Sequence, residues 1–149
     1  MEVWAYDPYI SPKDLEGTGI CLKESVDEVI TEADFLSLHV PSNEKTKGMM
    51  GKERFKLMKP SAFIINTSRG DIIREDALIE ALEHGEIAGA GIDVFEQEPP
   101  KEHNPLLKMK NVILTPHTAG LTRDAVAELA AGAAQNALDV LDGKPPSYS

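Results

Sequence analysis

An arginine, a glutamate and a histidine, far apart along the chain, are the side chains best suited to chemistry. Arg69 follows one short apolar run, Glu98 precedes two prolines, and His117 follows another apolar run. A planar guanidinium can hold a carboxylate through two parallel hydrogen bonds. A carboxylate beside an imidazole raises the histidine's pKa and orients its ring, which favours proton exchange near neutral pH. The three side chains together would suit proton transfer to an anionic substrate.

Each of these residues also has an ordinary structural explanation. Arg69 could be a surface arginine, Glu98 a solvated loop charge and His117 a surface histidine with satisfied hydrogen bonds. Asp7 precedes a proline and is typical of a turn, although a carboxylate at the end of a strand can also bind the ribose hydroxyls of a dinucleotide. No group of His, Cys, Asp and Glu has the spacing of metal ligands, so no metal is expected.

Strands and helices are predicted to alternate along most of the chain. A long helix is predicted to begin after Thr122, which can cap it, and to end at Gly143. Residues 96–111 are expected to form a long loop without clear structure. The predicted strands lie at residues 2–7, 19–22, 35–40, 62–66, 87–95 and 111–115. Three shorter helices are predicted at residues 25–33, 52–58 and 74–85.

This alternation indicates an α/β fold with a doubly wound, Rossmann-like parallel sheet. Nearly continuous apolar strands separated by helices predict a sheet that is covered on both faces. Ligands of such sheets bind outside the carboxyl ends of the strands. Asp7 ends the first predicted strand, and Asp93 lies at the end of the apolar run "IAGAGI". Pro41, His117 and the segment "NTSRG" follow other apolar strand segments. These residues are therefore expected along one edge of the sheet.

Composition narrows the class of partner. The chain has 149 residues, with 25 acidic and 15 basic side chains and a net charge of −10. This excess of negative charge argues against nucleic acid and against an anionic membrane surface as partners. No apolar stretch is long enough to cross a bilayer, and no secretion signal is expected at the N-terminus. Cys21 is alone and is expected to be a small core residue, in keeping with the cytoplasm.

Several segments resemble one enzyme family in the same order and over almost the whole chain. They are "YDP", "ADFLSLHVPSNEKT", "MKPSAFIINTSRGDIIREDALIEAL", "GEIAGAGIDVFEQEPP" and "HNPLLKMKNVILTPHTAG". The chain resembles the C-terminal part of the NAD-binding domain of the D-isomer-specific 2-hydroxyacid dehydrogenases, a family that includes D-3-phosphoglycerate dehydrogenase. The resemblance implies hydride transfer between NAD and a small 2-hydroxy or 2-oxo acid.

The resemblance also implies roles for individual residues. Arg69 matches the arginine that holds the substrate's carboxylate and carbonyl oxygen, and His117 matches the residue that exchanges a proton with that oxygen. Glu98 matches the acid that pairs with the histidine. Asp7 matches a ribose-binding acid and favours NAD, because a 2′-phosphate would meet a like charge. The remaining residues expected to line the cofactor are Pro41, Thr46, Thr67, Ser68, Asp93 and Gly120.

The chain also departs from the family pattern. The opening strand, its G-x-G-x-x-G turn and most of the substrate domain have no counterpart. Residues 1–121 are therefore expected to be a partial NAD-binding domain, and residues 122–149 a helix and tail leading toward the substrate domain. Arg74 replaces a residue that often caps the following helix. The absent strand is expected to leave two unpaired sheet edges and to favour self-association.

Three functional interpretations remain open at this stage. The first is a fragment of a cytoplasmic, homodimeric dehydrogenase, which by itself is expected to be inactive and to bind NAD weakly. The second is a non-catalytic binding or regulatory protein, as some corepressors related to these enzymes are. The third is a truncated product without activity.

Overall fold

The computed structural model describes residues 1–147. The chain forms two compact units, Met1–Pro116 and His117–Ser149. The division lies after Pro116, whereas the sequence analysis places a domain boundary after residue 121. That boundary concerns the whole protein and stays a prediction. The two units are described separately below.

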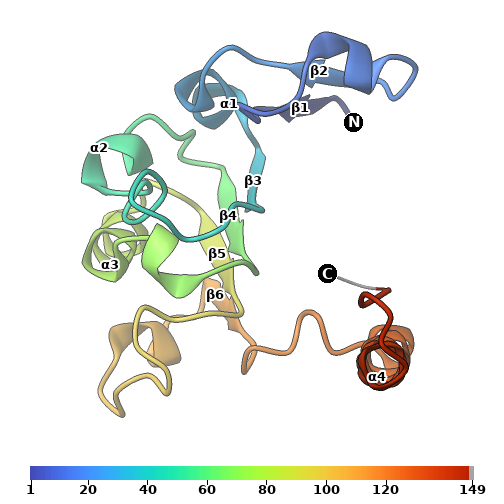
Figure 1. The fold of residues 1–149 in the computed structure, drawn as a ribbon. Helices are drawn as coiled ribbons and strands as arrows, with labels where there is room; N and C mark the ends of the chain where they lie inside the picture. The colour runs from blue at the N-terminus through green and yellow to red at the C-terminus, as the bar shows by residue number, and fades with distance from the viewer. Residues whose placement is uncertain (148–149) are drawn as a thin grey trace. The chain divides into compact units, whose positions relative to one another are not determined.

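The first unit contains two parallel sheets. Strands β1 (Val3–Ala5) and β2 (Ile20–Leu22) pair with each other. The second sheet has four strands in the order β3-β4-β5-β6 (Figure 1). These strands are Phe35–Leu38, Phe63–Asn66, Gly89–Ile92 and Val112–Leu114. Each of them lies within a segment that the sequence predicts as a strand, so the parallel α/β fold is confirmed.

The two sheets are not joined by hydrogen bonds between strands. Among residues 1–147, β1 and β3 each have a hydrogen-bonded neighbour on one side only. Two free edges are what the sequence predicts for a dinucleotide fold that lacks its central first strand. Neighbouring strands are therefore paired within each sheet, and no strand of one sheet pairs with a strand of the other among residues 1–147.

Three α-helices belong to this unit, namely α1 (Val26–Glu32), α2 (Lys52–Phe55) and α3 (Glu75–Glu83). All three lie in segments that are predicted to be helical. Helix α3 begins without a side-chain cap at Arg74, as the departure from the family pattern predicts. Its four buried residues, Ala77, Leu78, Ala81 and Leu82, recur at helical spacing and face the core.

Three short 3-10 helices were not predicted. They are η1 (Pro12–Leu15), η2 (Gly70–Ile72) and η3 (Pro105–Lys108). The last corrects the expectation that residues 96–111 lack structure. The side chain of Asn104 accepts a hydrogen bond of 3.0 Å from the Leu106 N–H, and Pro105 occupies the first helical position. Both features favour the start of a helical turn.

The helices of the first unit cover only one face of the four-stranded sheet. Along β3, Leu36 and Leu38 are buried, whereas the alternate residue Phe35 is 68 % exposed. Ile113 on β6 is 75 % exposed, and the ring of Phe63 on β4 stacks on that of Phe35 with centroids 5.5 Å apart. The prediction of a sheet covered on both faces is therefore wrong for this unit. Side chains alternate between faces, so the uncovered face keeps its apolar residues in solvent.

Cys21 provides a second correction. It lies at the centre of β2 and is exposed, so it is not a core residue. The two-stranded sheet is too small to bury both of its faces. On the same sheet, the ammonium group of Lys23 lies 3.6 Å from the centroid of the Trp4 ring. The Lys23 side chain therefore covers the Trp4 ring through a cation–π contact.

The second unit is dominated by α4 (Arg123–Leu141). The hydroxyl of Thr122 accepts a hydrogen bond of 3.1 Å from the Ala125 N–H, and Gly143 after the helix has a φ of 72°. Both ends of the helix thus match the prediction. Near its C-terminus, hydrogen bonds from Ser147 and Gln135 lower the pKa of the Asp139 carboxyl. None of the helices within residues 1–147 combines the length and apolarity required to span a membrane.

Candidate functional site

The carboxyl ends of the four strands of the larger sheet lie along one edge. Leu38 on β3 is in register with Asn66 on β4, Asn66 with Ile92 on β5, and Ile92 with Leu114 on β6. The strands are parallel, so the loops that follow them all leave from this edge. We call it the C-terminal edge. Within the first unit, the predicted site residues that follow these strands are Pro41, Thr46, Thr67, Ser68, Arg69, Asp93 and Glu98.

The loop that carries Arg69 is held by a buried asparagine. Asn66 ends β4 and is only 1 % exposed. Its amide nitrogen donates to the carbonyl of Arg69 at 2.9 Å, and its amide oxygen accepts from the N–H and the hydroxyl of Ser68 at 3.1 and 2.9 Å. The guanidinium of Arg69 is exposed, and its Nη1 donates to the carbonyl of Ser68 at 2.7 Å. The backbone of the loop is thus fixed while the charged group remains accessible.

The same loop lies directly against the segment that leads to Glu98. A Cβ atom added at Gly70 would lie 1.8 Å from the Phe95 carbonyl oxygen, so glycine is required for this approach of two backbones. The N–H of Phe95 donates to Glu98 Oε1 at 3.0 Å. Arg69 and Glu98 therefore belong to two loops that are in contact through Gly70 and Phe95.

The loop after β3 holds Pro41 and Thr46 together. The hydroxyl of Thr46 donates to the Pro41 carbonyl at 2.5 Å and accepts from the Asn43 N–H at 2.9 Å. The hydroxyl of Ser42 donates to Asp71 Oδ2 at 2.7 Å, which links this loop to the one after β4. Thr46 thus has a structural role in shaping the loop, and its role beside the cofactor stays a prediction.

Asp93 is the most deeply buried of the predicted site residues. It follows β5, is 3 % exposed, and its carboxylate accepts a hydrogen bond from the hydroxyl of Thr115. Its N–H donates to the carbonyl of Asn66 at 3.0 Å, and the N–H of Thr115 donates to the Ile92 carbonyl at 3.1 Å. These bonds extend the sheet one step beyond its regular strands, and they fix the start of the segment that leads to His117.

Asp7 lies after β1, at the end of the smaller sheet. Its Oδ1 accepts a hydrogen bond of 2.8 Å from the N–H of Tyr9. The turn explanation for Asp7 is therefore correct, and the carboxylate is exposed. Binding of a ribose by the same group stays a prediction.

His117 begins the second unit and is exposed. It is the single non-glycine residue among residues 1–147 with a positive φ, at 54°. A histidine in the left-handed region is uncommon, and such residues concentrate at functional sites. Gly120, three residues further on, is also exposed. The pairing of His117 with Glu98 involves both units and stays a prediction.

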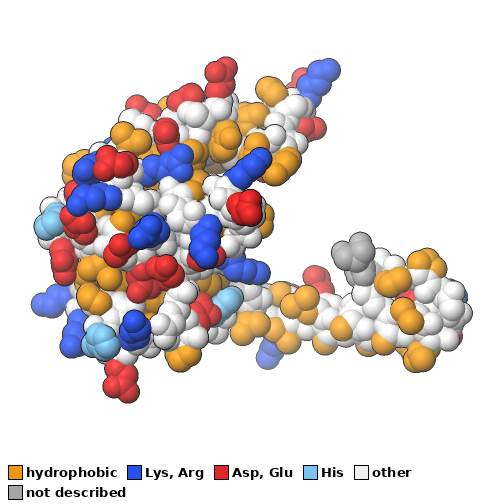
Figure 2. All heavy atoms as spheres, turned by 60° about the vertical axis from the view of Figure 1, so that its left-hand side comes forward, with side chains coloured by type: hydrophobic (Ala, Val, Ile, Leu, Met, Phe, Trp, Pro, Cys, Tyr) orange, Lys and Arg blue, Asp and Glu red, His pale blue; other side chains and the backbone are white. Residues whose placement is uncertain are grey.

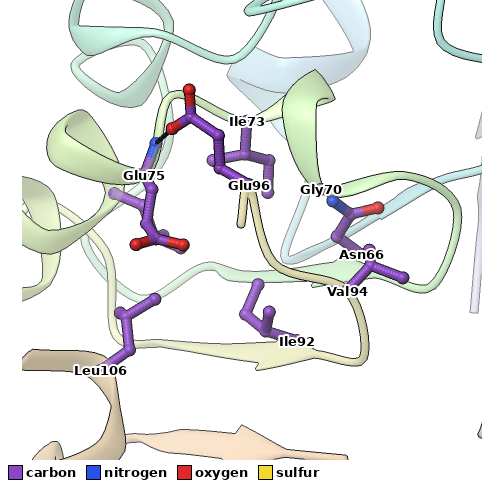
Figure 3. Close-up of a pocket in the computed structure, with 9 residues that line it drawn as sticks. Asn66, Gly70, Ile73, Glu75, Ile92, Val94, Glu96 and Leu106 are labelled. Atoms are coloured by element: carbon purple, nitrogen blue, oxygen red, sulfur yellow. Dashed lines mark hydrogen bonds between the residues drawn. The ribbon is translucent and has the colours of Figure 1, made fainter. Parts of the chain in front are cut away.

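Two hollows in the first unit lie beside α3, and Arg69 lines neither of them. The smaller, drawn in Figure 3, has a volume of about 10 Å³ and lies behind the Arg69 loop, between Asn66, Gly70, Glu75 and Glu96. Its volume is barely that of one water molecule. The larger, of about 390 Å³, is lined by Glu75, Glu96, Gln97, Pro100, Lys101, His103, Asn104 and Pro105.

Charge and potential metal ligands add no further site. Figure 2 shows acidic and basic side chains mixed over the visible face of the first unit, where no basic patch stands out. The described residues contain no group of three or more His, Cys, Asp or Glu side chains that could hold a metal ion. The C-terminal edge therefore remains the candidate site.

Sequence analysis missed three residues that organise this edge. Asn66, Gly70 and Thr115 were not proposed as site residues, yet they fix the Arg69 loop, its contact with Phe95, and Asp93. A buried asparagine at the end of an apolar strand and before "TSRG" was a usable signal, because asparagine commonly bonds to the backbone two residues ahead. The partners of Gly70 and Thr115 lie in other loops, so the sequence contained no comparable signal for them.

Comparison with known proteins gives a consistent result. Residues 1–119 match the family model described as D-isomer specific 2-hydroxyacid dehydrogenase, NAD binding domain. The chain belongs to this family. It is 47 % identical over 125 residues to D-3-phosphoglycerate dehydrogenase of Methanocaldococcus jannaschii, covering 84 % of this chain and 24 % of that protein. It is 39 % identical over 145 residues to the Archaeoglobus fulgidus protein of the same name, covering 97 % and 27 %.

A solved structure agrees with the fold. The structure of D-lactate dehydrogenase with NAD⁺ from Lactobacillus jensenii superposes with a TM-score of 0.89 at 34 % identity, over 98 % of this chain and 47 % of that one. NAD is the cofactor of this domain family. The chain spans about a quarter of the length of the two curated relatives above, and the activity of a whole protein is therefore considered below as a proposal.

Proposed function

We propose that this chain is the C-terminal part of the NAD-binding domain of an oxidoreductase acting on D-2-hydroxy acids or the corresponding 2-oxo acids. One observation carries the proposal. The loop bearing Arg69 and the loop bearing Glu98 lie in contact at the C-terminal edge, where ligands of parallel α/β sheets bind. Family membership supplies the reaction class, and this contact supports a shared site.

The donor groups of the first unit fit two parts of NAD. The Asp7 carboxylate, which follows β1 in the smaller sheet, suits ribose hydroxyls. At the C-terminal edge, Thr67, Ser68 and Asp93 offer hydroxyl and carboxylate groups after β4 and β5. No glycine-rich turn between a strand and a helix, the usual cradle for a pyrophosphate, occurs within residues 1–147. The described residues thus offer groups for the nicotinamide and ribose parts of the cofactor, and no glycine-rich turn for its pyrophosphate.

Three side chains have distinct chemical roles in the proposal. NAD, when bound, supplies or accepts the hydride. Arg69 binds the substrate's carboxylate and stabilises the negative charge that develops on the oxygen at C2. His117 exchanges a proton with that same oxygen. Glu98 pairs with His117 and keeps its ring oriented for the transfer. In the same proposal, Asp93, which is buried and bonded to Thr115, has the role of contacting the nicotinamide carboxamide.

A hybrid enzyme tests this proposal. The whole chain would replace the matching segment of the Archaeoglobus fulgidus relative, to which 97 % of it aligns. We expect the hybrid to oxidise NADH with a 2-oxo acid, assayed by absorbance, over a panel of acids that differ at C3. Inability of a folded hybrid to reduce any 2-oxo acid would favour a non-catalytic binding role.

Arg69→Ala in this hybrid provides the first specific prediction. Loss of a charge-assisted, two-pronged contact should raise the KM for the oxo acid by roughly 10²-fold, with a much smaller change in the KM for NADH. Arg74→Ala is the matched control, because Arg74 is also exposed and lies five residues further along the chain. Equal effects of the two substitutions would remove Arg69 from the substrate site.

A further inference from the structure

Asn66, the buried last residue of β4, organises the loop that carries Arg69. Every polar atom of its buried side chain bonds to the loop that carries Arg69. Its nitrogen donates to the Arg69 carbonyl at 2.9 Å, and its oxygen accepts from both the N–H and the hydroxyl of Ser68. With 1 % exposure, Asn66 has little access to water as an alternative partner.

The backbone of Asn66 extends the connection to the next strand. Its carbonyl accepts from the N–H of Asp93 at 3.0 Å, so the same residue fixes the points at which two site loops leave the sheet. The Arg69 carbonyl also accepts from the Ile72 N–H at 3.4 Å, and this bond starts η2. The conformation of residues 67–69 is thus determined from Asn66 on one side and from η2 on the other.

A backbone contact limits the remaining freedom of the loop. Gly70 packs against the carbonyl of Phe95, where a Cβ atom would lie 1.8 Å from the oxygen. Figure 3 shows Asn66 and Gly70 on one loop, beside the segment that carries Val94 and Glu96. The Arg69 loop therefore cannot shift toward the segment of Glu98 without a steric clash.

We propose that Asn66 is a positioning residue, which aims the Arg69 guanidinium at the substrate by fixing the backbone of residues 67–69. The inference rests on the proposed function, since it acts through Arg69. The side chain of Asn66 acts through its bonds to Ser68 and Arg69. A purely structural asparagine would contribute to folding stability and would leave the orientation of Arg69 unchanged.

Asn104 provides a matched control. It is also a buried asparagine, at 6 % exposure, and its oxygen also accepts from the N–H two residues ahead, that of Leu106. Its nitrogen donates to Glu75 at 2.7 Å, at the start of α3, so the bonds of this side chain hold Glu75 and Leu106 instead of residues of the Arg69 loop. Asn66→Ala and Asn104→Ala therefore remove similar sets of hydrogen bonds, but only the first releases the Arg69 loop.

The test combines kinetics of the hybrid with a double-mutant cycle. We expect Asn66→Ala to raise the KM for the oxo acid by about tenfold, as for one lost hydrogen bond, with the KM for NADH changed less than about twofold. In an Arg69→Ala background the same substitution should have no further effect on that KM, because its target is gone. Asn104→Ala should leave both KM values unchanged.

A second variant and an NMR measurement also test the role of Asn66. Asn66→Asp retains the acceptor for Ser68 and loses the donor to Arg69, so it provides a second variant if Asn66→Ala does not fold. In the isotope-labelled 149-residue chain, Asn66→Asp should shift the NMR signals of Ser68 and Arg69, and leave those of Leu106 in place.

The two hypotheses fail in different ways. If Arg69→Ala itself has no effect on the hybrid, the proposed function is wrong. If Arg69→Ala acts as expected but Asn66→Ala or Asn66→Asp leaves the KM unchanged, or adds fully to Arg69→Ala, the positioning role of Asn66 is wrong.

Discussion

At the scale of single residues, His117 combines an unusual backbone with a proposed chemical role. Its φ of 54° is a conformation that asparagine also adopts readily. His117→Asn should therefore preserve the backbone and remove the group that exchanges the proton. In the hybrid we expect kcat to fall by roughly 10²–10⁴-fold, with the melting temperature little changed.

An exposed histidine elsewhere serves as the control for this substitution. His84 follows α3 and has no proposed role, so His84→Asn should leave kcat unchanged. A His117→Asn hybrid with the kcat of the parent, at any pH between 5 and 9, would disprove proton transfer by His117. A large loss of stability would instead indicate that the imidazole has a structural role.

At the scale of elements, the contact between the loops after β4 and β5 depends on Gly70. A methyl group there would lie 1.8 Å from the Phe95 oxygen, so Gly70→Ala must separate two backbones. We expect a loss of about 1–3 kcal/mol or more in the free energy of unfolding, measured with urea on the 149-residue chain. Glu98 accepts a hydrogen bond from the N–H of Phe95, so displacement of Phe95 should also disorder the segment from Phe95 to Glu98.

Gly91, on β5, distinguishes this contact from a general effect of glycine replacement. A Cβ atom at Gly91 would lie 3.8 Å from Ile65, which is an ordinary contact, and its backbone is not left-handed. Gly91→Ala should be neutral or stabilising by up to about 1 kcal/mol, since alanine restricts the unfolded chain. Similar destabilisation by both substitutions would show that the packing at Gly70 has no special importance.

At the scale of the whole molecule, the uncovered face and the free edges of the sheets determine how the chain behaves in solution. Phe35 on the edge strand β3 is 68 % exposed, and the backbone of β3 lacks a partner strand on one side within residues 1–147. We expect the chain to self-associate, and light scattering should show a mass that rises with concentration.

A lysine at this edge tests the location of the contact. Phe35→Lys should reduce the association, because a charge on an edge strand opposes pairing between copies. Leu57, which follows α2 and is 43 % exposed, is the control position, and Leu57→Lys should leave the association unchanged. A monomer at all concentrations would contradict the prediction.

The sequence by itself determined the strands, the α-helices and the family. The apolar periodicity of α3, the Thr122 cap of α4 and the positions of Arg69 and Asp93 after strands are local patterns, set by neighbours within a few residues. Such patterns depend on few distant contacts, so they can be recognised in a chain that matches about a quarter of its relatives' length. They failed for Cys21, whose exposure depends on how much sheet surrounds it.

The tertiary structure alone decided which loops touch and which face of the sheet stays bare. The contact of Gly70 with Phe95 and the bond of Thr115 to Asp93 join residues more than twenty positions apart, and their sequence contexts are ordinary. Alternation along β3 indicates that two faces exist, but only the placement of the helices decides which one is buried. Contacts between distant segments depend on the packing of the whole unit, and no local pattern encodes them.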